Sequence, residues 1–147
     1  MGITGFSNRN KQVFDEIRQK WVAATPEELV RQQWLKRMVL QLGYPKQLIV
    51  VEKQIEGLER RLDILCYGKS SCPSQPFFPL LLVECKAESM TEEAFNQLMG
   101  YNDRVGARFV AVIAREEVRF GVFDPRQGRR VFCSFLPSFK ELIEWQS

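Results

Sequence analysis

Three charged residues interrupt two short runs of strand-forming residues, and their types could do chemistry together. Asp63 interrupts one apolar run, and Glu84 and Lys86 interrupt the next one along the chain. A carboxylate inside a buried strand is costly unless it is paired or binds a metal. Because side chains alternate along a strand, Glu84 and Lys86 project from one face, and Val83 and Cys85 project from the other. If Asp63 shares the face of Glu84, two carboxylates and an ammonium group lie close together.

The chain contains no histidine, and this absence excludes several classes of site. Ser-His-Asp and Cys-His catalysis, H-E-x-x-H zinc sites and histidine-based nucleases all require that side chain. The four cysteines, at positions 66, 72, 85 and 133, form no C-x-x-C pair, which argues against a zinc site and against a disulfide-stapled fold. Chemistry in this chain must therefore use carboxylates, lysine or both.

Length and composition predict one domain over residues 1–147, because 147 residues with 45% hydrophobic content can bury a single core. No apolar run approaches the roughly 20 residues of a membrane span. The start, Met1-Gly2-Ile3-Thr4, lacks the basic and apolar parts of a secretory signal. We therefore expect a cytoplasmic protein with no membrane partner. The net charge of +3 is compatible with a polyanionic partner but is too common to identify one.

Two helices are expected before the first long strand. The first is expected to reach about Val22 from a cap at Asn8 or Asn10, because apolar residues recur at every fourth position: Val13, Ile17 and Trp21. The second is expected to begin at a capping box, Thr25-Pro26-Glu27-Glu28, and to end at Gly43.

Strands are expected over Gln47–Ile55, around Asp63 and after Pro79, with the first two paired antiparallel. A capping box at Ser89-Met90-Thr91-Glu92 then predicts a helix. Its apolar stripe is Ala94, Leu98, Tyr101 and Val105.

The apolar run Phe109–Ala114 predicts a buried strand, and the succession strand, helix, strand predicts a parallel pair with a right-handed crossover. An edge hairpin is expected from Val118–Phe123 and Val131–Phe135. Ser138 is expected to cap a short last helix with apolar Phe139, Ile143 and Trp145.

The order of these elements and motifs resembles the PD-(D/E)XK nuclease superfamily. Asp63 is followed by Glu84-x-Lys86 on the next strand and by Gln97-x-x-x-Tyr101 on the next helix. More narrowly, the chain resembles the N-terminal nuclease domain of type I restriction enzyme R subunits, in a stand-alone version, over a core of about residues 25–123. Four segments carry this likeness: Thr25–Gln32, Gly43–Pro45, Arg61–Ile64 and Val83–Lys86.

Two features depart from the family pattern. Leu62 stands where the family motif has its nominal proline. The chain also has no Walker-type glycine-rich loop, so it does not encode the ATP-driven translocation of the full subunits.

The resemblance implies an α/β domain with a restriction-endonuclease-like mixed sheet flanked by helices. It also implies an Mg²⁺-dependent endonuclease, with Mn²⁺ as a substitute, that hydrolyses phosphodiester bonds, with DNA as the expected substrate. Asp63 and Glu84 would hold the metal, which needs one or two carboxylates plus waters. Lys86 would orient or deprotonate the attacking water.

By the same resemblance, Glu28 would reach a metal-bound water, and Gln97 would position the metal water or Lys86. Tyr101 lies one turn beyond Gln97 and is a candidate for nucleic-acid contact. Arg31, Arg61 and the neighbouring Arg60 are candidates for phosphate contact.

Plainer interpretations compete with these roles. Asp63, Glu84 and Lys86 could form a structural ion pair, and Glu28 could serve only in the capping box. Gln97 could bond to backbone, Tyr101 fits the core better than catalysis, and the arginines could simply be solvated.

For the whole chain, one rival is a nucleic-acid-binding or assembly module of the same fold with no activity of its own. Another rival is a non-enzymatic interaction protein in which the carboxylates form an ion-pair network. A homodimer, or a larger restriction, defence or repair assembly, is also compatible with the sequence.

Overall fold

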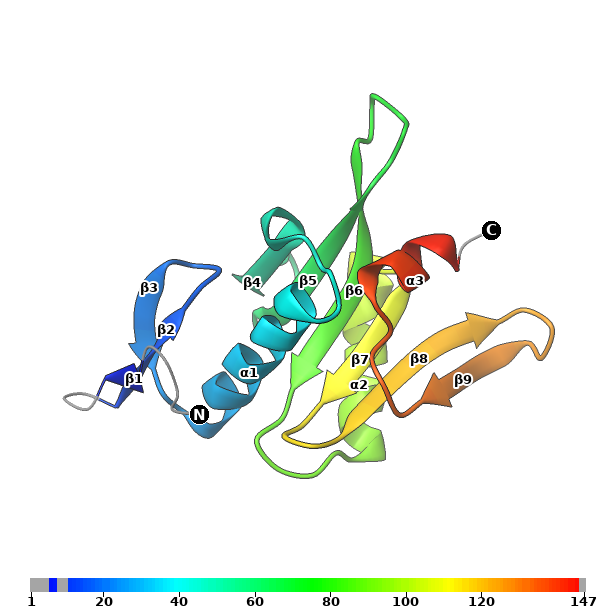
Figure 1. The fold of residues 1–147 in the computed structure, drawn as a ribbon. Helices are drawn as coiled ribbons and strands as arrows, with labels where there is room; N and C mark the ends of the chain where they lie inside the picture. Colours follow the sequence, from blue (N-terminus) through cyan, green and yellow to red (C-terminus); the bar gives the residue numbers. More distant parts are fainter. Residues whose placement is uncertain (1–5, 8–10, 146–147) are drawn as a thin grey trace.

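The computed structural model describes residues 6–7 and 11–145, and its centre is a six-stranded mixed sheet (Figure 1). The strand order is β4-β5-β6-β7-β8-β9, with α1 and α3 on one face and α2 on the other. This arrangement confirms the predicted α/β class with a mixed sheet flanked by helices. The central strands are β4 (Ile49–Lys53), β5 (Leu62–Lys69), β6 (Phe77–Cys85), β7 (Phe109–Ile113), β8 (Val118–Asp124) and β9 (Arg129–Cys133). The other elements are β1 (Phe6–Ser7), β2 (Gln12–Asp15), β3 (Lys20–Ala23), α1 (Pro26–Leu40), η1 (Lys46–Leu48), α2 (Glu92–Val105) and α3 (Phe139–Glu144).

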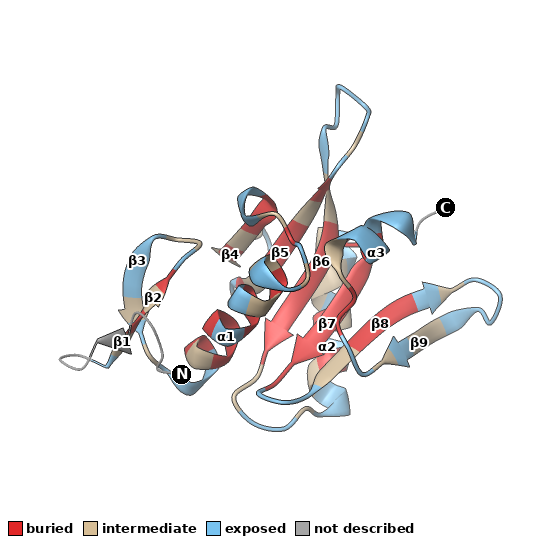
Figure 2. Cartoon of the chain, viewed as in Figure 1, coloured by how far each residue is buried: buried red, intermediate tan, exposed pale blue. Residues whose placement is uncertain are grey.

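Strand pairing follows the hydrophobic pattern. The pairs β4–β5 and β5–β6 are antiparallel, and β6–β7 is parallel because α2 carries the chain back across the sheet. Every residue of β7 is buried, as the continuous apolar run predicts, and β8 and β9 form the predicted edge hairpin (Figure 2). The predicted parallel crossover is confirmed.

The two faces of the sheet belong to different cores. Val83 and Cys85 pack in the core beneath α1 and α3, whereas Leu82 packs in the core beneath α2. The Glu84 carboxylate accepts a hydrogen bond from Arg60, whose guanidinium lies over Tyr101 of α2, so Glu84 belongs to the α2 face. The predicted separation of Glu84 from Val83 and Cys85 is therefore confirmed.

The predicted first helix is wrong, because residues 12–23 form a hairpin, β2–β3, which pairs with β1 in a small three-stranded sheet beside α1 (Figure 1). The buried Asp15 carboxylate closes the turn by accepting hydrogen bonds from the backbone N–H groups of Ile17 and Arg18. Such side chain–backbone bonds favour turns over helices. The proposed caps Asn8 and Asn10 lie outside the described residues.

The second predicted helix, α1, starts where the sequence indicates. Thr25 caps α1, and its Oγ1 accepts a hydrogen bond from the Glu28 N–H at 3.2 Å. The helix ends at Leu40, shortly before Gly43, which has a positive φ of 73°. The second half of the predicted capping box does not form, since the Glu28 carboxylate is bonded elsewhere.

Several boundaries differ from the sequence-based expectation. Thr91, and not Ser89, caps α2. In α3 the predicted Ser138 cap is confirmed as a complete capping box, but the buried apolar residue is Leu142, while Trp145 is 48% exposed.

Among the described residues, no helix is long and apolar enough to cross a membrane.

Candidate functional site

A row of three carboxylates crosses three neighbouring strands at one end of the sheet. Ile64 pairs with Val83, so one further step of the β5–β6 register places Asp63 across from Glu84. Glu52 lies between the residues of β4 that pair with Ile64 and Leu62, and it therefore lies across from Asp63 on the other side. The strands bring Glu52, Asp63 and Glu84 together although the chain separates them.

The pair Asp63–Glu84 forms the buried part of this row. Asp63 Oδ2 accepts a hydrogen bond from the backbone N–H of Cys85 at 2.8 Å, which fixes the carboxylate beside the end of β6. Glu84 is 4% exposed. Burial, and then the hydrogen bond with Asp63 and its charge, raise the pKa of Glu84 to about 9. The raised pKa favours the protonated form of Glu84, which can donate a hydrogen bond to Asp63.

Two cations adjoin the Glu84 carboxylate. Arg60 Nη2 donates to Glu84 Oε1 at 3.0 Å, and the Arg60 guanidinium lies over the Tyr101 ring at 5.8 Å from its centre. Lys86 follows directly after β6, is half-buried, and lies close enough for its charge to lower the pKa of Glu84. The structure thus brings Lys86 to the carboxylate pair, while Tyr101, among the described residues, is linked to this pair through Arg60.

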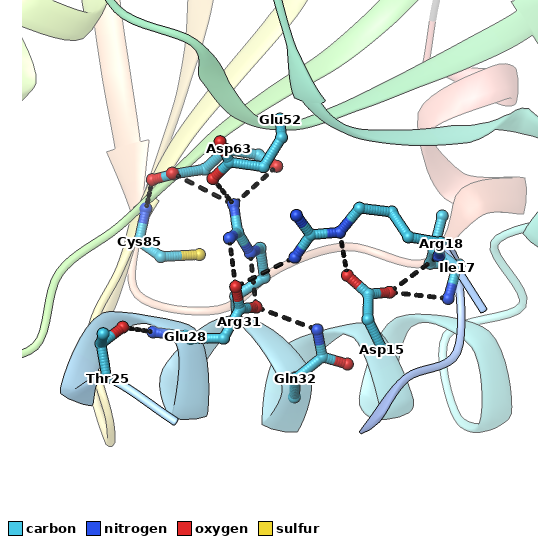
Figure 3. A network of polar contacts seen from close by, with 10 residues as sticks. All are labelled: Asp15, Ile17, Arg18, Thr25, Glu28, Arg31, Gln32, Glu52, Asp63 and Cys85. Atoms are coloured by element: carbon cyan, nitrogen blue, oxygen red, sulfur yellow. Dashed lines mark hydrogen bonds and ion pairs between the residues drawn. The ribbon is translucent and has the colours of Figure 1, made fainter. Parts of the chain in front are cut away.

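Arg31 lies at the centre of a buried ion-pair network on the α1 side (Figure 3). Its Nε and Nη2 donate to the two oxygens of Glu28 at 2.9 and 2.5 Å. Its Nη1 donates to Glu52 Oε1 at 2.7 Å and lies 3.4 Å from both Asp63 Oδ1 and the Asp63 carbonyl oxygen. At 6% exposure, Arg31 faces these acids and not solvent, which differs from the predicted phosphate contact.

Glu28 accepts hydrogen bonds on both of its carboxylate oxygens. Oε1 accepts from Arg18 and Arg31, and Oε2 accepts from Arg31 and Gln32. Burial alone would raise the pKa of Glu28, but these hydrogen bonds and the two arginine charges hold it below its ordinary value. A carboxylate with four nitrogen donors has no oxygen left to face a metal-bound water, so the predicted role of Glu28 would require Arg18 or Arg31 to move.

The remaining predicted residues are on the surface. Gln97 is exposed and has no partner among the described residues, and it lies one turn before Tyr101 on α2. Arg61 is also exposed, just before β5 begins. Neither residue touches the carboxylate pair in this structure.

Sequence reasoning missed two members of the network, Glu52 and Arg18. Glu52 lies within β4 and has a positive φ of 56°, which is unusual for a residue with a side chain. The sequence does hold a signal for Glu52: it is a carboxylate directly after the apolar Val51, on a strand expected to pair antiparallel with the strand of Asp63. Arg18 had no such signal, because its segment resembled a helix.

Asp63 and Glu84 are the carboxylates in this row that could hold a divalent cation together. Among the described residues, no group of three or more His, Cys, Asp or Glu side chains is arranged to hold a metal ion. Mg²⁺, however, is commonly held by one or two carboxylates and several waters. Asp63 and Glu84 supply two adjacent carboxylates whose mutual repulsion a cation would relieve, so these residues fit such an ion.

A family model described as the type I restriction enzyme R protein N terminus matches residues 26–137. The chain belongs to this family. The resemblance inferred from the motifs is thus confirmed, and the match to the R protein N terminus extends beyond the predicted limit near residue 123. Membership of this family links the chain to restriction enzymes and to a nuclease-like role. No curated protein and no solved structure matches the chain at a significant level.

Proposed function

We propose that this R protein N-terminal domain is a divalent-metal-dependent nuclease that hydrolyses phosphodiester bonds in DNA. The observation that carries the proposal is the Asp63–Glu84 pair, in which a buried carboxyl with a pKa raised to about 9 lies beside a second carboxylate. Strongly perturbed acids of this kind are typical of catalytic sites. Family membership adds independent support for a nuclease.

In this proposal Asp63 and Glu84 hold Mg²⁺, or Mn²⁺ in its place. The bound ion would supply Lewis acidity toward the phosphate and a water of lowered pKa. Glu84 must release its proton before it can act as a ligand. Asp63 is already oriented by its hydrogen bond from the Cys85 N–H, so little rearrangement is needed on that side.

Lys86 is the group proposed to act on the attacking water. Its half-buried position directly after β6, beside the Glu84 carboxylate, lets the amine orient the water or accept its proton. In this chain without histidine, Lys86 is the side chain best placed for that step.

The other residues are proposed to serve the substrate and the support of the site. Gln97, exposed on α2, and Arg61, exposed just before β5, are proposed to contact the incoming nucleic acid, with Tyr101 holding Arg60 in place. Arg31 is buried, so we assign it to support Asp63 and not to phosphate. Glu28 is assigned to hold Arg31, in place of the metal-bound water inferred from the family.

One observation favours a second candidate function, an interaction module in which these acids form a structural ion-pair network. Glu28 and Glu52 are already paired with Arg31, and Glu84 is paired with Arg60. In that case no cation is needed for charge balance. The two candidates differ in one property, since the network alone predicts neither metal binding nor cleavage.

Plasmid cleavage tests the proposal with a matched pair of lysine variants. Lys86→Met should lower kcat by about 100-fold or more, the usual contribution of a general acid–base group. Lys69→Met changes an exposed lysine at the opposite end of β5 from Asp63 and should leave kcat unchanged. Cleavage should need Mg²⁺ or Mn²⁺ and no ATP. Equal activity of wild type and Lys86→Met would rule out the assigned role.

A further inference from the structure

A β-hairpin that precedes the matched family region reaches the site through one arginine. The family match begins at residue 26, and β2–β3 ends at Ala23. Arg18 lies in the turn of this hairpin, and its Nη2 donates to Glu28 Oε1 at 3.0 Å (Figure 3). The hairpin therefore supplies a contact that the matched family region does not contain.

Arg18 is itself held in place by Asp15. The Arg18 Nε donates to Asp15 Oδ2, while Asp15 Oδ1 accepts from the backbone N–H groups of Ile17 and Arg18 at 2.8 and 3.0 Å. Asp15 is completely buried, at 0% exposure. An arginine that bonds to two carboxylates from different nitrogens is fixed in direction, in contrast to an ordinary surface arginine.

A continuous series of contacts leads from this turn to the candidate metal ligand. Glu28 Oε1 accepts from Arg18 and also from Arg31 Nη2. Arg31 Nη1 then lies 3.4 Å from Asp63 Oδ1 and donates to Glu52. We propose that Arg18 is a positioning residue of this site: it fixes the Glu28 carboxylate, and Glu28 in turn holds Arg31 against Asp63.

Removal of Arg18 should loosen Arg31 without removing any group that touches substrate. Glu28 Oε1 would keep one donor in place of two, so the carboxylate and the guanidinium bound to it gain freedom to rotate. Lysine should restore this contact only in part. The two contacts of Arg18 come from different nitrogens of a planar fork, whereas an ammonium group is a single point charge.

The geometric claim is tested by hydrogen exchange of the Arg31 Nε–H, measured by NMR on the full chain without metal or DNA. Arg18→Met should speed this exchange by about tenfold, because local opening becomes easier, and Arg18→Lys should have a smaller effect. Lys20→Met is the control, since Lys20 is an exposed cation on β3 of the same hairpin. If Arg18→Met fails to fold, the lysine variant still tests the claim. Unchanged Arg31 exchange in a folded Arg18 variant would overturn the proposal.

The catalytic consequence rests on the proposed nuclease function and has its own measurement. Arg18→Met should lower kcat for plasmid cleavage by about tenfold while KM for DNA stays unchanged, as expected for a group that only orients the site. A raised KM with an unchanged kcat would contradict this. If the wild type cleaves nothing, the nuclease proposal fails, but faster Arg31 exchange would still establish Arg18 as the residue that positions this network.

Discussion

Glu84 lies beside Asp63 at the end of β6, and the hydrogen bond between these two carboxyl groups, with burial, raises the pKa of Glu84 to about 9. The backbone N–H of Cys85 donates to Asp63 Oδ2 at 2.8 Å and fixes the position of that carboxylate. The raised pKa favours the protonated form of Glu84.

The first prediction concerns pH and stability in the metal-free protein. The folded-state pKa of Glu84 is raised from an ordinary 4.5 to about 9, so between these values the native state binds a proton that the unfolded state has released. Stability is therefore lost as pH rises from about 5 to 9, by an amount on the order of a few kcal/mol, because one pKa unit corresponds to about 1.4 kcal/mol.

Glu84→Gln should remove most of that pH dependence and should be more stable than wild type at pH 8.5. Thermal melts in EDTA across this range measure both proteins. Parallel curves for the two proteins would show that the Glu84 proton does not exist. Glu88→Gln, which changes an exposed carboxylate just beyond Lys86, should follow wild type.

The second prediction concerns Glu28. Glu28→Gln removes the charge that two arginines share, one of them buried, and loss of one partner of a buried pair costs about 3–5 kcal/mol. Glu27→Gln, its exposed neighbour in the first turn of α1, should cost well under about 1 kcal/mol. Urea unfolding of the two variants separates these values, and equal small losses would mean that the Glu28–Arg31 network contributes little to stability.

The third prediction concerns the hydrogen bond that links the segment after α1 to the segment before α3. The buried Tyr44 hydroxyl, after the end of α1, donates to the Pro137 carbonyl at 2.7 Å, just before α3. Tyr44→Phe should cost about 1–3 kcal/mol because a buried carbonyl is left without its donor. Tyr67→Phe is the matched control, since Tyr67 is half-buried and its hydroxyl has no partner among the described residues. Equal unfolding free energies for both variants would contradict this role of Tyr44.

The sheet and the carboxylate pair were predictable because both follow from alternation. Apolar runs set β5 and β6, the turn-rich loop between them sets an antiparallel pair, and the register then places Asp63 beside Glu84. The parallel strand β7 follows in the same way from its unbroken apolar sequence. Local pattern and global fold agree in this part of the chain.

The N-terminal hairpin and the arginine network could not be predicted in this way. Val13, Ile17 and Trp21 have helical spacing, but the hydrogen bonds that the Asp15 side chain accepts stabilise a turn. A search for hydrophobic periodicity does not detect such bonds. The place of Arg31 depends on Glu52, whose positive φ aims its carboxylate at the guanidinium. Arginine side chains are long, so their partners are set by tertiary structure and not by position in the sequence.

Calorimetric titration of the full chain with Mn²⁺ at pH 7, in two buffers of different ionisation enthalpy, tests the central claim most directly. Because Glu84 holds a proton until a cation replaces it, binding to wild type should release about one proton per ion. Asp63→Asn removes one ligand at nearly constant shape and should lose the binding. Wild-type protein that binds no Mn²⁺, or that binds it without proton release and as tightly as Asp63→Asn does, would contradict the account.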